Sequence, residues 1–190
     1  DAANGSGITI AILDSGVDSP HPDLTANLVP CWNMVDNNSN TSDVNGHGTK
    51  VSGTAALVAN NGNGSAGVAW GARIMPVRIS NAEGYTYWST VAQAINWAAD
   101  KGAKVANISF NGVSGSATVK SAADYMRSKG GVVVASAGNT SGFQSYPASN
   151  SILAAAATDS GDNRTSWSSY GDYVDVAAPG VSIYSTVNGG

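Results

Sequence analysis

Residues 45–56 read NGHGTKVSGTAA, and this stretch organises the rest of the chain. It places His47 between two glycines at the start of a predicted helix whose other residues are mostly small. Each interior glycine costs such a helix about 1 kcal/mol against alanine. We therefore expect the helix to lie centrally buried, where small side chains let neighbouring backbones approach. A histidine on its first turn would face a cleft and suit a general base, although histidine beside glycine is also a common turn or cap residue.

A second stretch, GITIAILDSGVD at residues 7–18, is an apolar run that stops at an aspartate. A continuous apolar run of this length predicts a strand covered on both faces, as in a parallel sheet. Asp14 then lies at the carboxyl end of the strand, where open α/β sheets place their ligands. Alone, Asp14 fits an Asx-turn or a helix cap equally well. Together, Asp14 and His47 provide a carboxylate that orients the ring and an imidazole that acts as the base.

Strand and helix patterns alternate along the remaining sequence. Helices are predicted from His47 to about residue 59, over 90–101, and from a Ser116 cap through Met126. Strands are predicted over 73–79, 105–110, 132–135, 152–157 and 173–178, with polar loops at 33–45 and 60–65. This alternation predicts a doubly wound α/β fold with a mostly parallel sheet and helices on both faces. Without repeats or linkers, residues 1–190 are expected to form a single domain.

Composition narrows the classes of partner. Charged residues make up 12% of the 190 positions and the net charge is -4, with no basic run, which argues against nucleic acid and anionic membrane surfaces. No apolar segment is long enough to span a bilayer. Cys31 is the only cysteine, so no disulfide can form within residues 1–190, and a small buried side chain is the simpler interpretation of it.

Five motifs carry a resemblance to a known family. They are DSGVD at 14–18, HPDL at 21–24, GHGT at 46–49, SAGN at 136–139 and APGVSI at 178–183. In this order they resemble the subtilisin-like serine proteases. The family's nucleophile lies in a Gly-Thr-Ser-x-Ala motif, which does not occur here. The chain is therefore expected to be a subtilisin-like catalytic domain that is incomplete at its C-terminus, and at its N-terminus as well.

The resemblance implies a secreted serine endopeptidase that cuts peptide bonds in extended protein substrates. Its serine would lie beyond residue 190, so the 190-residue stretch alone is expected to be inactive. Asp14 would be the orienting acid, His47 the base and Asn139 the side-chain donor of the oxyanion hole. Without the resemblance, a turn is the favoured interpretation of Asn139 after a glycine.

The family binds its substrate as an added strand between two edge segments. The matching residues are Ser109, Phe110, Asn111, Ser136, Ala137 and Gly138, with Trp88 at the floor of an apolar subsite. The family commonly has Ser-Leu-Gly-Gly at the first segment, so Phe110 and Asn111 are departures. The bulkier Asn111 is predicted to narrow the space for the residue preceding the scissile bond. Lys50 is a further departure, because many members have a second histidine there.

The resemblance also implies a structural calcium ion held by Asp23, Asn61 and Asn63. Oxygen ligands suit calcium, but a plain Asn-Gly turn explains the same residues. The expected partners are the substrate, a propeptide or protein inhibitor, and the C-terminal segment carrying the nucleophile. The alternative function is an inactive, truncated domain that binds such partners without cutting them. A flavodoxin-like binding domain is disfavoured, because no glycine-rich phosphate loop follows the first strand.

Overall fold

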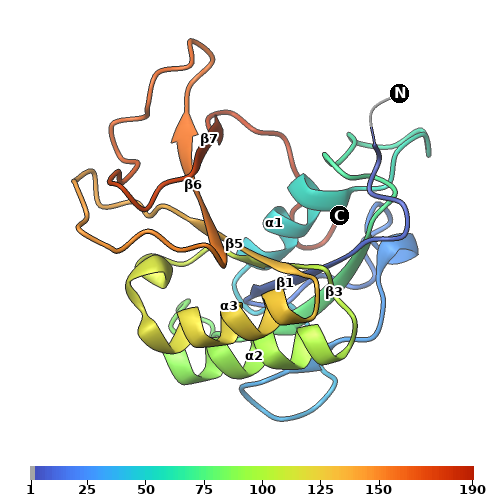
Figure 1. Ribbon diagram of the computed structural model, residues 1–190. Coiled ribbons are helices and arrows are strands. Elements are labelled where there is room, and N and C mark those ends of the chain that lie inside the picture. Colours follow the sequence, from blue (N-terminus) through green and yellow to red (C-terminus); the bar gives the residue numbers. More distant parts are fainter. Residues whose placement is uncertain (1–2) are drawn as a thin grey trace.

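A seven-stranded sheet runs through residues 3–190, the part of the chain that the computed structural model describes (Figure 1). Its strands are β1 (Thr9–Asp14), β2 (Trp32–Asn33), β3 (Arg73–Arg78), β4 (Val105–Ile108), β5 (Val132–Ser136), β6 (Ile152–Thr158) and β7 (Val176–Pro179). The helices are α1 (His47–Ala56), α2 (Trp88–Asp100) and α3 (Ala117–Ser128), with short 3₁₀ turns at Thr25–Asn27 and Val113–Gly115. No helix in the described range is long and apolar enough to cross a membrane.

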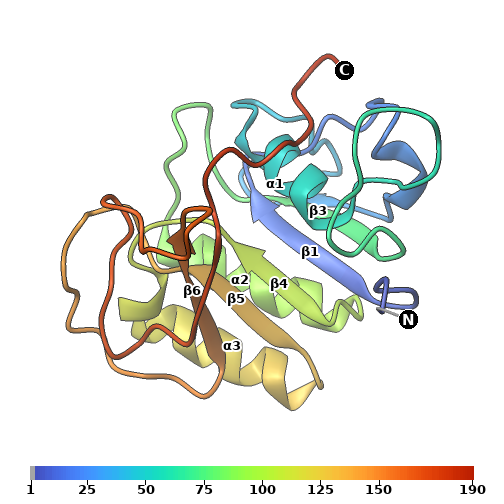
Figure 2. The ribbon, with the colours of Figure 1, turned by 90° about the horizontal axis from the view of Figure 1, so that it is seen from above.

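The strand order is β2-β3-β1-β4-β5-β6-β7, and each pairing between these strands is parallel. The predicted doubly wound α/β architecture with a mostly parallel sheet is confirmed. β1 lies between β3 and β4, so the chain builds the sheet outward from β1 in both directions. Ligands bind at such a switch point, outside the carboxyl ends of the strands. The carboxyl end of β1 lies at this point (Figure 2), and Asp14 is the last residue of the strand.

Alternate residues of β1 belong to two separate apolar cores. Ala11 and Leu13 pack into the core that contains α2 and α3, whereas Ile12 packs into the core that contains Ala56 of α1. The helices α2 and α3 lie side by side on one face of the sheet, and α1 lies on the other (Figure 1). Burial of a side chain such as Leu13 is worth about 1.5–3 kcal/mol, so this double coverage explains the continuous apolar run in the sequence.

Close backbone contacts explain the small residues of α1. A Cβ atom on Gly48 would overlap the carbonyl oxygen of Gly16, and one on Gly53 would overlap the hydroxyl of Thr186. The helix thus packs directly against the turn after β1 on one side and against the C-terminal segment on the other. Thr186 Oγ1 also donates a hydrogen bond of 2.6 Å to the carbonyl oxygen of Thr49. The predicted central position of this helix is confirmed.

The structure corrects several predicted boundaries. Helix α1 ends at Ala56 rather than near residue 59, because the backbone becomes extended at Leu57, whose side chain is buried. Helix α2 begins at Trp88, before the predicted start. The predicted strand at 173–178 begins only at Val176, because residues 171–174 form a turn in which the Val174 amide donates a hydrogen bond of 3.1 Å to the Gly171 carbonyl oxygen. The short edge strand β2 lies at the start of a predicted loop.

Candidate active site

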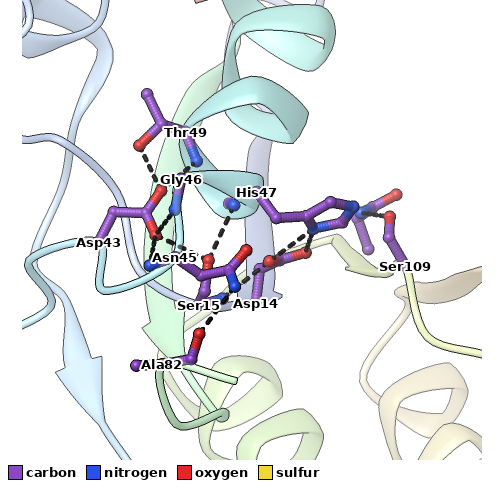
Figure 3. Close-up of polar contacts among 11 residues, drawn as sticks. Asp14, Ser15, Asp43, Asn45, Gly46, His47, Thr49, Ala82 and Ser109 are labelled. Atoms are coloured by element: carbon purple, nitrogen blue, oxygen red, sulfur yellow. Dashed lines mark hydrogen bonds and ion pairs between the residues drawn. The ribbon is translucent and has the colours of Figure 1, made fainter. Parts of the chain in front are cut away.

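The carboxylate of Asp14 and the imidazole of His47 meet at the end of β1. Nδ1 of His47 lies 2.8 Å from Oδ1 and 3.0 Å from Oδ2 of Asp14. Asp14 is buried, and its Oδ1 also accepts a hydrogen bond of 2.8 Å from the Ser15 amide. The predicted meeting of the strand-end acid and the helix-start histidine is therefore present in the fold (Figure 3).

The His47 ring is accessible from solvent, so it can exchange a proton with a group bound in the cleft. Its side chain is 50% exposed, whereas that of Asp14 is 1% exposed. The hydrogen bond that Nδ1 donates to Asp14 raises the pKa of His47 above its ordinary value of 6.5, and burial opposes this shift. Since Nδ1 is bound to the carboxylate, Nε2 is the nitrogen left for a substrate or a nucleophile.

A second carboxylate, Asp43, holds the turn after β1 and the start of α1 together. Its Oδ1 accepts hydrogen bonds from the Ser15 hydroxyl at 2.7 Å and the Gly46 amide at 2.8 Å. Its Oδ2 accepts from the amide and the hydroxyl of Thr49 at 2.8 and 2.6 Å. The Ser15 hydroxyl in turn accepts from the Gly48 amide at 3.0 Å. Asp43 therefore connects the backbone that carries Asp14 to the helix that carries His47 (Figure 3).

The sequence analysis missed Asp43 and Ser15. Asp43 lies shortly before a helix start, where aspartate commonly caps the free amide groups, and this was the available signal. Burial alone would raise the pKa of Asp43, but hydrogen bonds from Thr49, Gly46, Ser15 and Asn45 together lower it below 3.8. The carboxylate is therefore ionised in its native surroundings at neutral pH.

We expect Asp43→Ala to lower the free energy of unfolding by about 1–2 kcal/mol at pH 7, the range for a lost helix cap on a half-buried group. Because the folded-state pKa is depressed, the stabilisation is present above the unfolded pKa of about 3.9 and is lost as the pH falls through the lower folded value. This difference in the free energy of unfolding is measured by urea unfolding at pH 7 and at pH 3, with the full-length protein blocked by an active-site inhibitor. An equal difference between wild type and variant at both pH values would contradict the assignment.

Asn139 and two loop segments complete the cleft. Ser109–Asn111 follows β4, Ser136–Asn139 begins at the last residue of β5, and these strands are paired neighbours. One cavity of about 270 Å³ is lined by residues that include Asp14, His47, Asn111 and Asn139. A second, of about 940 Å³, is lined by His47, Ser136–Asn139 and apolar residues of β6 and the C-terminal segment. The acid, the histidine and the predicted substrate-binding segments therefore converge on one cleft.

The comparison with known proteins decides the family. A profile of the subtilase family matches residues 5–189. The chain belongs to the subtilase family. Thermitase from Thermoactinomyces vulgaris is 50% identical over 189 residues, which cover 98% of this chain and 67% of thermitase. The thermophilic serine proteinase of Bacillus sp. strain AK1 is 44% identical, with 97% of this chain and 46% of that protein covered.

Solved structures agree with this assignment. Sphericase superposes with a TM-score of 0.86 at 35% identity, covering 98% of this chain and 70% of sphericase. A cold-adapted subtilisin-like serine proteinase superposes with a TM-score of 0.84 at 31% identity, covering 98% of this chain and 67% of that chain. The fold of this subtilase is therefore subtilisin-like, and its relatives support a peptidase of the serine type.

Trp88 is placed differently from the other predicted substrate-binding residues of this subtilase. It begins α2, is 38% exposed, and its ring lies beside Gly112, where a Cβ atom would be 3.5 Å away. It lines neither of the two cavities that contain His47. Its predicted role as a subsite floor therefore gains no support from the cavity geometry.

The three predicted calcium ligands lie around one turn. Asp23 is buried, and its Oδ1 accepts a hydrogen bond of 2.8 Å from Nδ2 of Asn61. Oδ1 of Asn61 accepts from the amide of Asn63 at 3.0 Å. The Asn61 side chain is thus hydrogen-bonded to both Asp23 and Asn63, and it presents its amide nitrogen, not its oxygen, to the Asp23 carboxylate. As placed, the turn lacks the oxygen cage of 6–8 ligands that calcium prefers. Residues 3–190 contain no cluster of three or more histidine, cysteine or acidic side chains suited to a metal.

Proposed function

We propose that this subtilase is a serine endopeptidase that hydrolyses peptide bonds in extended segments of protein substrates. The observation that carries the proposal is the pairing of Nδ1 of His47 with the buried Asp14 carboxylate. The pairing leaves the opposite ring nitrogen for proton transfer in a cleft that also contains Asn139. We treat residues 1–190 as part of one catalytic domain.

Each residue of the cleft has a defined task in this mechanism. Nε2 of His47 takes the proton of the attacking serine hydroxyl and later gives it to the leaving amine. Asp14 holds the ring in the tautomer with a proton on Nδ1 and stabilises the imidazolium as it forms. The side-chain amide of Asn139 donates a hydrogen bond to the oxygen that becomes negative in the tetrahedral intermediate. The edge segments at Ser109–Asn111 and Ser136–Gly138 bind the substrate backbone.

We place the nucleophile beyond residue 190. Ser109 and His47 line the same two cavities, and the Ser109 hydroxyl accepts a hydrogen bond of 3.2 Å from Asn107. Among residues 3–190, no serine hydroxyl is hydrogen-bonded to His47. The cavity of about 940 Å³ beside His47 offers room for a further segment. Apolar side chains exposed near the C-terminal end support such a segment: Val176, Val181, Ile183, Tyr184 and Val187.

Other parts of the proposal rest on the resemblance. It implies that the protease acts outside the cell, and that a propeptide or a protein inhibitor binds its substrate cleft. Calcium at Asp23 stays a prediction. To hold the ion, the Asn61 amide has to turn so that its oxygen faces Asp23, and the loop has to supply carbonyl oxygens. The ion would then stabilise the fold without taking part in the reaction.

The competing function is an inactive domain that binds a peptide, a propeptide or an inhibitor without cutting it. A fluorophosphonate probe separates the two, because it reacts only with an activated serine. We expect the full-length protein to be labelled on a serine outside residues 1–190, which peptide mapping by mass spectrometry locates. Labelling on Ser109 would contradict the proposed site of the nucleophile. An unlabelled full-length protein that also leaves an unfolded protein substrate uncut would support the inactive domain.

A further inference from the structure

Two hydrogen bonds join the loop segments on either side of the substrate cleft. Ile108 of β4 pairs with Ala135 of β5, so the segments that follow leave the same edge of the sheet side by side. Close to the strands, the hydroxyl of Ser136 donates to the carbonyl oxygen of Phe110 at 3.2 Å. Farther out, Oδ1 of Asn111 accepts a hydrogen bond of 2.9 Å from the backbone amide of Asn139. The crevice between the segments is therefore bridged at both levels.

The outer bridge is made by a side chain that crosses the crevice. Asn111 reaches over Gly138, where a Cβ atom would lie only 3.4 Å from Oδ1 of Asn111. Asn111 lines the smaller cavity and is absent from the lining of the larger one, although His47, Ser109 and Asn139 line both. Asn111 thus lines the smaller cavity and is hydrogen-bonded to Asn139, which lines both.

We propose that Asn111 is a specificity-determining residue that restricts the substrate residue preceding the scissile bond to a small side chain. This inference rests on the proposed function. A peptide bound between the two segments has to insert that side chain into the crevice beside Asn139. A large side chain displaces Asn111 and breaks its bond to the Asn139 amide, whereas glycine, alanine or serine leaves the bond intact.

The bridge also positions the proposed oxyanion donor. Oδ1 of Asn111 accepts a hydrogen bond from the backbone amide of Asn139, and the side chain of Asn139 faces the developing negative charge. A large substrate side chain therefore lowers kcat/KM in two ways. It does not fit the space beside Asn111, and it loosens the Asn139 donor when negative charge develops on the substrate oxygen. Hydrophobic pockets discriminate by about 10–200-fold for one methylene, so an effect of tenfold or more is expected between alanine and phenylalanine substrates.

The test uses the full-length protein and two tetrapeptide p-nitroanilides that differ only in the last residue, alanine or phenylalanine. The measured quantity is the ratio of kcat/KM for the phenylalanine substrate to that for the alanine substrate. We expect Asn111→Gly and Asn111→Ala both to raise this ratio tenfold or more. The backbone φ of Asn111 is not positive, so alanine fits there without strain. Asn37→Gly is the matched control, because Asn37 is an exposed turn residue outside both cavities, and it should leave the ratio unchanged.

Each result has one meaning. A ratio that stays within threefold of wild type in both Asn111 variants would overturn the inference while leaving the protease intact. A rise in the glycine variant alone would assign the effect to backbone freedom and would also overturn it. If the wild-type protein neither cuts the substrates nor reacts with a fluorophosphonate, the proposed function itself fails.

Discussion

Replacing His47 by alanine in the full-length protein is expected to lower kcat about 10⁶-fold, the loss measured in subtilisin when the same base is removed. The reason is that Nε2 of this ring is the group left free for proton transfer, since Nδ1 is bound to Asp14. In the proposed mechanism the two edge segments bind the substrate, so KM should change far less than kcat. Steady-state hydrolysis of a peptide substrate, with a fluorophosphonate labelling rate as a second readout, measures both.

The control for this variant is the only other histidine. His21 is buried in a turn, where Nδ1 accepts a hydrogen bond of 3.1 Å from the Asp23 amide. Asparagine can accept the same bond, so His21→Asn should keep kcat within threefold of wild type. A comparable collapse of kcat in both variants would show that the loss comes from misfolding and not from a missing base.

Replacing Asp14 by asparagine is expected to lower kcat about 10⁴-fold, which is the typical loss when the orienting acid of a serine protease is neutralised. The isosteric amide keeps the shape of the buried site, but it cannot stabilise the imidazolium and favours the wrong tautomer of His47. The measurement is kcat under saturating substrate. A loss below tenfold would contradict the orienting role.

The Asp43→Asn variant tests whether the loss of kcat requires removal of the Asp14 charge or follows from neutralising any acidic side chain near α1. Asp43 hydrogen-bonds to Ser15, Gly46 and Thr49 and makes no hydrogen bond to the His47 ring, whose pKa its charge raises less than Asp14 does. Its neutralisation should therefore lower stability while costing kcat far less than the Asp14 change. Equal losses of kcat in the two variants would mean that the fold of the turn, and not the carboxylate at Nδ1, controls the reaction.

The central part of the fold and site was predictable because its signals are local. The apolar run before Asp14 indicates a strand buried on both faces, and the glycines around His47 indicate a helix in tight contact with its neighbours. The structure bears out both, through the two cores on β1 and the close packing of Gly48 and Gly53. The strand end and the helix start already suggested the pairing of Asp14 with His47, and the resemblance then added the role of Asn139.

The remaining parts depend on contacts between segments that are distant in the sequence. Asp43 lies in a polar loop, and nothing in its neighbourhood shows that it binds Ser15, 28 positions away. The Asn111 bridge depends on how far apart the loops after β4 and β5 lie, which follows from strand pairing and not from residue type. The start of β7 was misplaced because residues 171–174 form a turn, closed by a hydrogen bond from the Val174 amide to the Gly171 carbonyl oxygen, that precedes the strand.

The titration of His47 tests the account most directly. In the wild-type full-length protein, the hydrogen bond that His47 donates to Asp14 should place the titration midpoint of the ring, followed by NMR of its carbon-bound protons, above 6.5. In Asp14→Asn the stabilising charge is gone, so the midpoint should fall, and the acid limb of kcat/KM should move to lower pH with it. The same midpoint in both proteins would show that the carboxylate and the ring do not act as a pair, and it would contradict the proposed mechanism.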